Sequence, residues 1–373
     1  MLNQAALGTI DEMIDSSATL DADKLDFRVP ANTLFFDEQF ALHVDAPALA
    51  YDDVTANLPA YPGQERTLQH RVLDVTDAAA HQLYLKLGKT HFGKGGTRGL
   101  PGEYLDRFPA PERAQILNWT LSRSKDTLMV RSFGFVGRAF LDDLYPRIWN
   151  TDLLRQVRRV LDDKGELERT ELARPFLDAD QLHLKIWFPD TGGNNGNLKV
   201  GAVIRNGEVG NSSLDALAMV QRHSCANSIV VGLDAYGTPM GYSITHYPGA
   251  SAAALMTQFY AALPSVMNAS ANIINRMIEA EGIALPDFQQ ILDGLAIEHG
   301  WQYRFKNLIG EGTEGQRTLM GLVNGITYAA HDSELSPAKV LDVEIIGGNL
   351  LYAPQPELAR LIKQAELGKK VRA

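Results

Sequence analysis

The sequence has one cysteine, Cys225, among 373 residues, and this scarcity excludes a disulfide framework. A single thiol forms neither an internal disulfide nor a cysteine metal site, and low cysteine content is typical of a reducing compartment. Long apolar runs are also missing: no stretch approaches 18 apolar residues, and residues 1–9 show no basic segment followed by an apolar one. We therefore expect a cytoplasmic protein without a membrane span or a secretory signal.

The short motifs of common enzymes are absent as well. The chain contains no H-E-x-x-H, no G-x-S-x-G and no P-loop. Pro189-Asp190 followed by Lys199 is similar to the Pro-Asp…acid-x-Lys pattern of a metal-dependent nuclease fold, but Asn197 stands where the second acid belongs, which leaves a divalent ion short of ligands. We predict no catalytic residue, no cofactor and no metal, with a metal-dependent nuclease kept as an alternative.

Hydrophobic residues make up 45% of the chain and charged residues 21%, which is typical of a globular protein with a substantial core. The patterning predicts an α+β fold with a central antiparallel β-sheet flanked by helices and a helix-rich C-terminal third. It divides the chain into an acidic N-terminal arm or lobe (residues 1–75), an α+β core with an antiparallel meander (76–247) and a helical region packed on that core (248–373).

Alternation of period two is clearest in residues 181–220, where apolar positions of residues 182–188, 198–204 and 214–220 predict three antiparallel strands. His183 lies in the first of them, and a lone strand histidine is typical of a packed or hydrogen-bonded residue. Residues 127–140 predict a hairpin, and residues 33–36 the one strand of the N-terminal arm. Helical spacing predicts helices in residues 76–87, 111–121, 151–161, 252–282, 286–299, 315–330 and 356–367, with Pro264 kinking or splitting the fourth.

Charge is distributed unevenly along the chain. The formal net charge is -10, but residues 84–174 carry 17 basic and 12 acidic side chains. Aromatic residues such as Trp119 and Tyr145 are interleaved with these cations. Cations neutralise phosphates and flat rings stack on unpaired bases, so this combination is typical of single-stranded nucleic-acid binding. The alternative is that the rings belong to the core and the cations to solvated faces.

The segment from Gly93 to Gly99 is glycine-rich and basic. Its backbone N–H groups, together with Lys94 and Arg98, are suited to a nucleic-acid backbone, although the segment is equally typical of an ordinary exposed turn.

Three segments carry a resemblance to a known family: residues 138–145, residues 147–154, and Asn211-Ser212 leading into residues 222–227. Over roughly residues 75–330 the chain resembles the phage- and plasmid-associated family defined by domain of unknown function 932. Residues 91–99 look like an insertion, and Leu144 replaces an expected basic residue. The resemblance implies a role in the replication, recombination or maintenance of mobile-element DNA in a bacterial host.

The residues that match this family have two interpretations. In the first interpretation, Arg138 and Arg222 contact phosphate, and Asn227 contacts a base or backbone edge. In the second, these residues form with Tyr145 a hydrogen-bonded network that fixes strand ends. Cys225 is either a small buried residue or a nucleophile.

The leading prediction is a non-catalytic factor that binds single-stranded DNA, possesses a basic groove and anneals strands, as a homo-oligomer. A protein-interaction or host-takeover factor is the rival; it predicts dispersed basic residues paired with Asp126, Asp142, Asp143, Asp162 and Asp163. Convergence of the arginines on one face favours nucleic acid. The predicted nucleic-acid-binding residues are Lys94, Arg98, Arg113, Arg123, Arg131, Arg138, Tyr145, Arg155, Arg159, Arg222 and Asn227.

Overall fold

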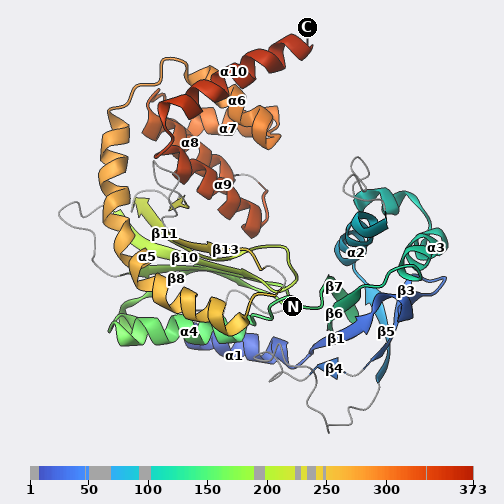
Figure 1. The fold of residues 1–373 in the computed structure, drawn as a ribbon. Helices are drawn as coiled ribbons and strands as arrows, with labels where there is room; N and C mark the ends of the chain where they lie inside the picture. The colour runs from blue at the N-terminus through green and yellow to red at the C-terminus, as the bar shows by residue number, and fades with distance from the viewer. Residues whose placement is uncertain are drawn as a thin grey trace.

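The computed structural model describes residues 8–46, 48–49, 69–91, 102–188, 198–222, 228–232, 241–246, 249–332 and 334–372. It contains two β-sheets, each covered by helices, and the predicted α+β class with a helix-rich C-terminal region is confirmed. The sheets belong to two lobes that stand side by side in Figure 1. In the described part of the chain, no helix combines the length and the apolar character that crossing a membrane requires.

The first lobe is built on a seven-stranded sheet of order β2-β3-β5-β7-β6-β1-β4, antiparallel except where β5 pairs with β7. One face of this sheet packs against α2 (Asp77–His91) and α3 (Ala110–Leu121). Thr76 caps α2, because its Oγ1 accepts a hydrogen bond from the Ala79 N–H at 3.2 Å. The strands are β1 (Lys24–Pro30), β2 (Phe35–Phe36), β3 (Ala41–Ala46), β4 (Ala48–Leu49), β5 (Gln69–Val75), β6 (Thr127–Phe133) and β7 (Val136–Asp142).

The second lobe is built on a six-stranded antiparallel sheet, in which β12, β11, β10, β9 and β8 follow one another and β13 also pairs with β11. The predicted meander is confirmed as β9 to β11. Its alternation is confirmed too, since Leu184 and Ile186 face the main core while Trp187 faces the opposite side. The strands are β8 (Glu171–Leu177), β9 (Gln181–Phe188), β10 (Leu198–Gly207), β11 (Leu214–Arg222), β12 (Ser228–Val231) and β13 (Gly241–Ile244).

Helices cover both faces of the second sheet (Figure 1). α1 (Ile10–Asp21), α4 (Asn150–Asp163) and α5 (Ala252–Glu281) contribute to the main core on one face, and α9 (Pro337–Leu350) packs on the other. α5 stays continuous through Pro264 and bends along its length (Figure 1), so the proline does not split it. The remaining helices are α6 (Phe288–His299), α7 (Tyr303–Gly312), α8 (Leu319–Asp332) and α10 (Gln355–Arg372).

The two largest hydrophobic cores of the described chain do not follow boundaries at residues 75 and 247. The first-lobe core draws on Phe27, Leu73 and Phe140, so strands on both sides of residue 76 share one sheet. The second-lobe core joins Ile10 of α1 to Leu361 of α10. The expectation of a single strand in the N-terminal arm is wrong: α1 and strands β1 to β5 lie there, because Leu25, Phe27 and Val29 alternate with charged residues.

Candidate ligand pocket

Two of the predicted arginines lie near α3: Arg113 in its first turn and Arg123 just beyond its C-terminal end. Arg113 makes an ion pair with Asp77 at 3.2 Å and lies over the Phe40 ring at 4.3 Å. Arg123 lies over the ring of Trp119 at 4.2 Å, and half of the Trp119 surface is exposed. The first arginine therefore ties α3 to the start of α2, whereas the second forms a basic and aromatic surface with Trp119.

Arg131 and Arg138 point from the first-lobe sheet toward the second lobe. Arg131 is buried and donates two hydrogen bonds of 2.8 Å to the Asp26 carboxylate, and a third to the backbone oxygen of Glu208. Arg138 pairs with Asp180, which lies just before β9. Both guanidinium groups thus have an acidic partner within the chain, and Arg131 is withdrawn from solvent.

Tyr145 belongs to the same contact between the lobes. Its hydroxyl lies 2.7 Å from Nδ1 of His246, and burial followed by the Arg131 charge lowers the pKa of His246 to about 4. Buried Lys24 pairs with Glu208 across this contact at 2.7 Å. We call this contact the lobe junction and define it by eight buried residues of the two lobes: Lys24, Asp26, Arg131, Tyr145, Arg147, Trp149, Glu208 and His246.

The predicted arginines on α4 lie elsewhere, on the second lobe. Arg155 pairs with Asp152 at 3.3 Å, and Arg159 lies over the Tyr260 ring at 5.2 Å. Lys94, Arg98 and Asn227 fall outside the described residues, as do the side chain of Arg222 and all of Cys225.

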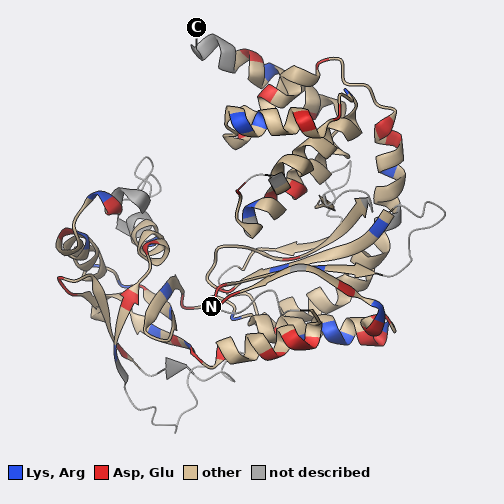
Figure 2. Cartoon of the chain, turned by 180° about the vertical axis from the view of Figure 1, so that it is seen from behind, with Lys and Arg blue, Asp and Glu red and all other residues tan. Residues whose placement is uncertain are grey.

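The described arginines are consequently distributed over α3 and the segment after it, β6, β7 and α4, and Figure 2 shows basic and acidic positions interspersed on both lobes. First-lobe cations pair with acids, as in Lys86 with Asp142 and Arg28 with Asp143. Arg138 pairs with Asp180 and Tyr145 with His246, so each has a partner inside the chain, and the network that would include Arg222 and Asn227 stays a prediction. Among the described residues, no group of three His, Cys, Asp or Glu side chains is arranged to hold a metal; Asp190 and Asn197 lie outside them.

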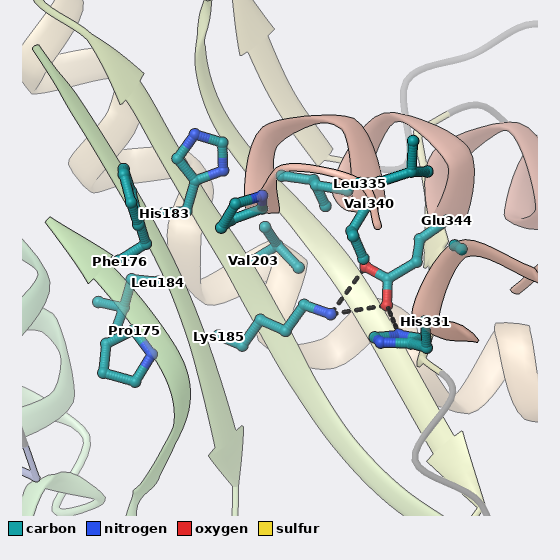
Figure 3. A pocket seen from close by; sticks show the side chains of 13 residues that line it. Pro175, Phe176, His183, Leu184, Lys185, Val203, His331, Leu335, Val340 and Glu344 are labelled. Atoms are coloured by element: carbon teal, nitrogen blue, oxygen red, sulfur yellow. Dashed lines mark hydrogen bonds and ion pairs between the residues drawn. The ribbon is translucent and has the colours of Figure 1, made fainter. Parts of the chain in front are cut away.

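A cavity of about 390 Å³ lies on the α9 side of the second-lobe sheet (Figure 3). Most of its wall is apolar, with Phe176 from β8, Val203 from β10 and Leu335 from the segment before α9. We call it the sheet–helix pocket. Its polar wall consists of His183, Lys185, His331 and Glu344.

Three of these polar groups form one ionic cluster, visible at the right of Figure 3. Lys185 Nζ donates to both carboxylate oxygens of Glu344 at 2.7 Å, and His331 Nε2 lies 2.8 Å from Oε1 of the same carboxylate. Burial alone would raise the pKa of Glu344, but the hydrogen bond from His331 and the charge of Lys185 hold it below its ordinary value. Glu344 is therefore a fixed anion whose charge is compensated inside the protein.

The fourth polar group, His183, is different because one of its ring nitrogens has no partner. Nε2 lies 3.1 Å from Gln181 Oε1, an atom that only accepts, so Nε2 carries the hydrogen. Nδ1 is then a lone-pair acceptor; it is buried and makes no hydrogen bond within the described structure. Burial, and secondarily the charge of Arg205, lower the pKa of His183 to about 4, so the ring is neutral near pH 7.

Because His183 places an unpartnered acceptor in the wall of an apolar cavity, the pocket favours a ligand that donates a hydrogen bond. Leaving a buried polar atom unsatisfied costs about 1–3 kcal/mol, which a ligand donor would recover. A cavity of this size with a few convergent polar groups is the usual form of a small-molecule site.

Sequence reasoning did not select this pocket. The alternation of β9 places His183 and Lys185 on one face, but Glu344 lies 159 residues beyond Lys185. A signal was present in α9, where Glu344 is a lone acid in the apolar run from Val343 to Ile346.

Comparison of the chain with protein-family models, with curated proteins and with solved structures found no match, so the resemblance drawn from residues 138–227 stays a prediction.

Proposed function

We propose that the protein binds a small, uncharged and largely apolar molecule in the sheet–helix pocket. The observation that carries this proposal is the buried Nδ1 of His183, an acceptor without a partner in the wall of a cavity. The bound molecule donates a hydrogen bond to Nδ1 from a hydroxyl or amide group, and its apolar body contacts Phe176, Val203 and Leu335.

Charge balance argues against a charged ligand. Lys185 and Glu344 compensate each other, and His183 is neutral near pH 7, so an added ion would lose hydration without gaining a counter-charge. An alcohol or phenol loses less hydration free energy than an ion does, and its hydroxyl can donate to Nδ1 of His183.

The test is a binding screen by saturation-transfer NMR with the full chain. Neutral phenols and alcohols should bind, whereas benzoates and benzylamines of matched size should not. His183→Phe keeps a ring but removes the acceptor, so it should weaken phenol binding about tenfold. His43→Phe, in the first lobe, is the matched control and should bind normally. Equal binding by His183→Phe and the wild type would contradict the proposal.

A second candidate is single-stranded nucleic-acid binding at the C-terminal end of α3. Arg123 makes no ion pair with any described residue and stacks on Trp119, which is 51% exposed. The Asn118 side chain ties α3 to β2, where Phe35 is 54% exposed. Exposed rings beside an uncommitted guanidinium are suited to unpaired bases and a phosphate. Strand annealing and the mobile-element setting remain predictions attached to this candidate.

Fluorescence anisotropy of a labelled oligonucleotide across a salt series tests this candidate. We expect preference for single over double strands and affinity that falls linearly with salt on logarithmic axes. Trp119→Ala should lose about 1–3 kcal/mol of binding, the typical contribution of one stacked base. Phe135→Ala, an exposed ring in the β6–β7 turn, is the control. Absence of binding at low salt would contradict the candidate.

A further inference from the structure

A second cavity, of about 520 Å³, lies on the opposite side of the N-terminal half of α9 from the sheet–helix pocket. Its wall combines the turn between α6 and α7 with α7 itself and with residues of α9. We call it the C-terminal groove. The residues that determine its chemistry are His299, Trp301, Arg304, Phe305, Glu334 and Lys339.

The floor of the C-terminal groove is a row of rings. His299 and Trp301 stack with centroids 5.2 Å apart and planes 29° apart, and Phe305 lies 5.1 Å beyond Trp301. Trp301 and Phe305 also pack on the second-lobe core, which fixes their positions. A planar apolar group can therefore lie on an aromatic floor that is already in place.

The rim of the groove carries charges that are not used within the protein. Arg304, Lys339 and Glu334 are exposed, and none of them forms an ion pair with another residue in the described ranges. The other rim acid, Asp342, is held by Arg205 at 2.6 Å. Two cations and one carboxylate are thus left to interact with a ligand.

We propose that the C-terminal groove binds a free aromatic amino acid in its zwitterionic form. The ring lies on Trp301 and Phe305, the carboxylate meets Arg304 and Lys339, and the ammonium group meets Glu334. Both charges of the ligand find a counter-charge that the protein itself leaves unpaired, and charge-assisted contacts are the stronger class of hydrogen bond.

The same rim disfavours a nucleotide. A base would fit the aromatic floor, but its phosphate would lie near Glu334 as well as near the cations. Binding of a nucleotide monophosphate in preference to an amino acid is therefore an outcome that overturns the proposal.

Isothermal titration calorimetry of the full chain with L-phenylalanine tests it. L-phenylalanine should bind, and 3-phenylpropionate, 2-phenylethylamine and L-leucine should each bind about tenfold more weakly because each lacks one of the three matched groups. Adenosine monophosphate is the competing probe. Binding of either truncated analogue as tight as that of L-phenylalanine, or tighter binding of the nucleotide, would overturn the proposal.

Because the charged rim residues are exposed, they can be substituted without disturbing the fold. Arg304→Gln and Lys339→Gln should weaken L-phenylalanine but leave 2-phenylethylamine unchanged, whereas Glu334→Gln should weaken L-phenylalanine but leave 3-phenylpropionate unchanged. Lys363→Gln and Glu311→Gln, exposed positions outside the groove, are the controls. If the rim variants behave like the controls, the groove is not the site. Phenol binding at His183 is measured separately, so either proposal can fail alone.

Discussion

At the scale of single residues, the buried carboxylate of Glu344 carries the largest electrostatic cost in the sheet–helix pocket. A fully buried ion is stable only with its partners, here Lys185 and His331. Apolar replacement of a whole buried ion pair is often neutral, whereas removal of one partner leaves a charge without compensation. Single and double variants at this pair therefore have different expected outcomes.

We expect Glu344→Leu alone to lower the free energy of unfolding by about 3 kcal/mol, because the partly buried Lys185 loses its counter-charge. Lys185→Met combined with Glu344→Leu should restore most of that loss. Urea unfolding followed by circular dichroism measures both. If the double variant is as unstable as the single one, Glu344 stabilises the protein through the packing of α9 on the sheet and not through its charge.

Two buried histidines make stability depend on pH. The pKa of His183 and of His246 is lowered to about 4 by burial. Between pH 6.5 and pH 4 the unfolded chain takes up protons that the folded chain does not, so stability is lost as the pH falls. At pH 5 we expect a loss of about 2 kcal/mol for each histidine relative to pH 7. Urea unfolding at both pH values should show this loss of stability. His183→Phe and His246→Phe should each remove the part of the loss that its histidine causes. An unchanged pH dependence in both variants would show that these two histidines are not its source.

Part of the sheet–helix pocket could be predicted from the sequence. The period-two pattern of residues 182–188 places His183 and Lys185 on one face of a strand, because alternation determines the face whatever the partner is. It does not determine what covers that face. The pairing with Glu344 depends on how α9 docks, and no local pattern encodes contacts 159 residues apart.

At the scale of elements, α9 is the common wall of both cavities. Val340, Leu341 and Glu344 line the sheet–helix pocket, while Lys339 and Asp342 line the C-terminal groove. The helix lies very close to β12, because a methyl group at Gly348 would overlap the carbonyl oxygen of Val230. Glycine at this position therefore sets the distance between helix and sheet.

We expect Gly348→Ala to push α9 away from β12 and to lower the free energy of unfolding by about 1–3 kcal/mol, the usual cost of overpacking. Binding in the sheet–helix pocket should weaken in the same variant. Gly310→Ala in α7 is the matched control, since a methyl group there meets nothing and alanine favours a helix by about 0.5–1 kcal/mol. Thermal unfolding that ranks the two variants in the reverse order would contradict this account.

The elements that sequence patterns predicted correctly are those with strong periodicity or clear ends, such as the helix capped by Thr76 and the hairpin of β6 and β7. α9 was missed because its apolar residues surround most of the helix, so no polar face marks its period. The dipeptide Asn206-Gly207 is typical of a hairpin turn, yet these two residues form the last positions of β10, where the Asn206 side chain donates to the Ile148 backbone oxygen and to Asn150. Tertiary contacts outweighed the local turn preference there.

At the scale of the whole molecule, the lobe junction couples the two halves through buried charge. Lys24 of the first lobe pairs with Glu208 of the second, and Glu208 also accepts the Asn150 backbone N–H at 2.7 Å. Burial raises the pKa of Glu208, opposed by the charges of Lys24 and Arg131. Removal of one partner of such a pair is costly, because the other charge then stays buried without a counter-charge.

Glu208→Gln is therefore expected to uncouple the lobes and to destabilise the protein by about 3–5 kcal/mol. Differential scanning calorimetry should show one transition for the wild type and two for the variant. Glu171→Gln, which removes the exposed pair with Lys199, should change stability by no more than about 1 kcal/mol. A single unshifted transition in Glu208→Gln would mean that the junction carries no coupling.

The packing of α1 on α4 has a consequence for the order in which the protein forms. The chain leaves the second lobe after α1, builds the first lobe from residues 24–142 and returns at α4. During synthesis, that first-lobe stretch leaves the ribosome as one continuous segment and can fold early. Ile10 and Met13 of α1 can pack only after Val157 has been synthesised, and the second-lobe core is complete only after Leu361 has left the ribosome. α1 is thus synthesised before the first lobe but packs only after it, so its apolar face stays exposed to chaperones while residues 24–142 are translated.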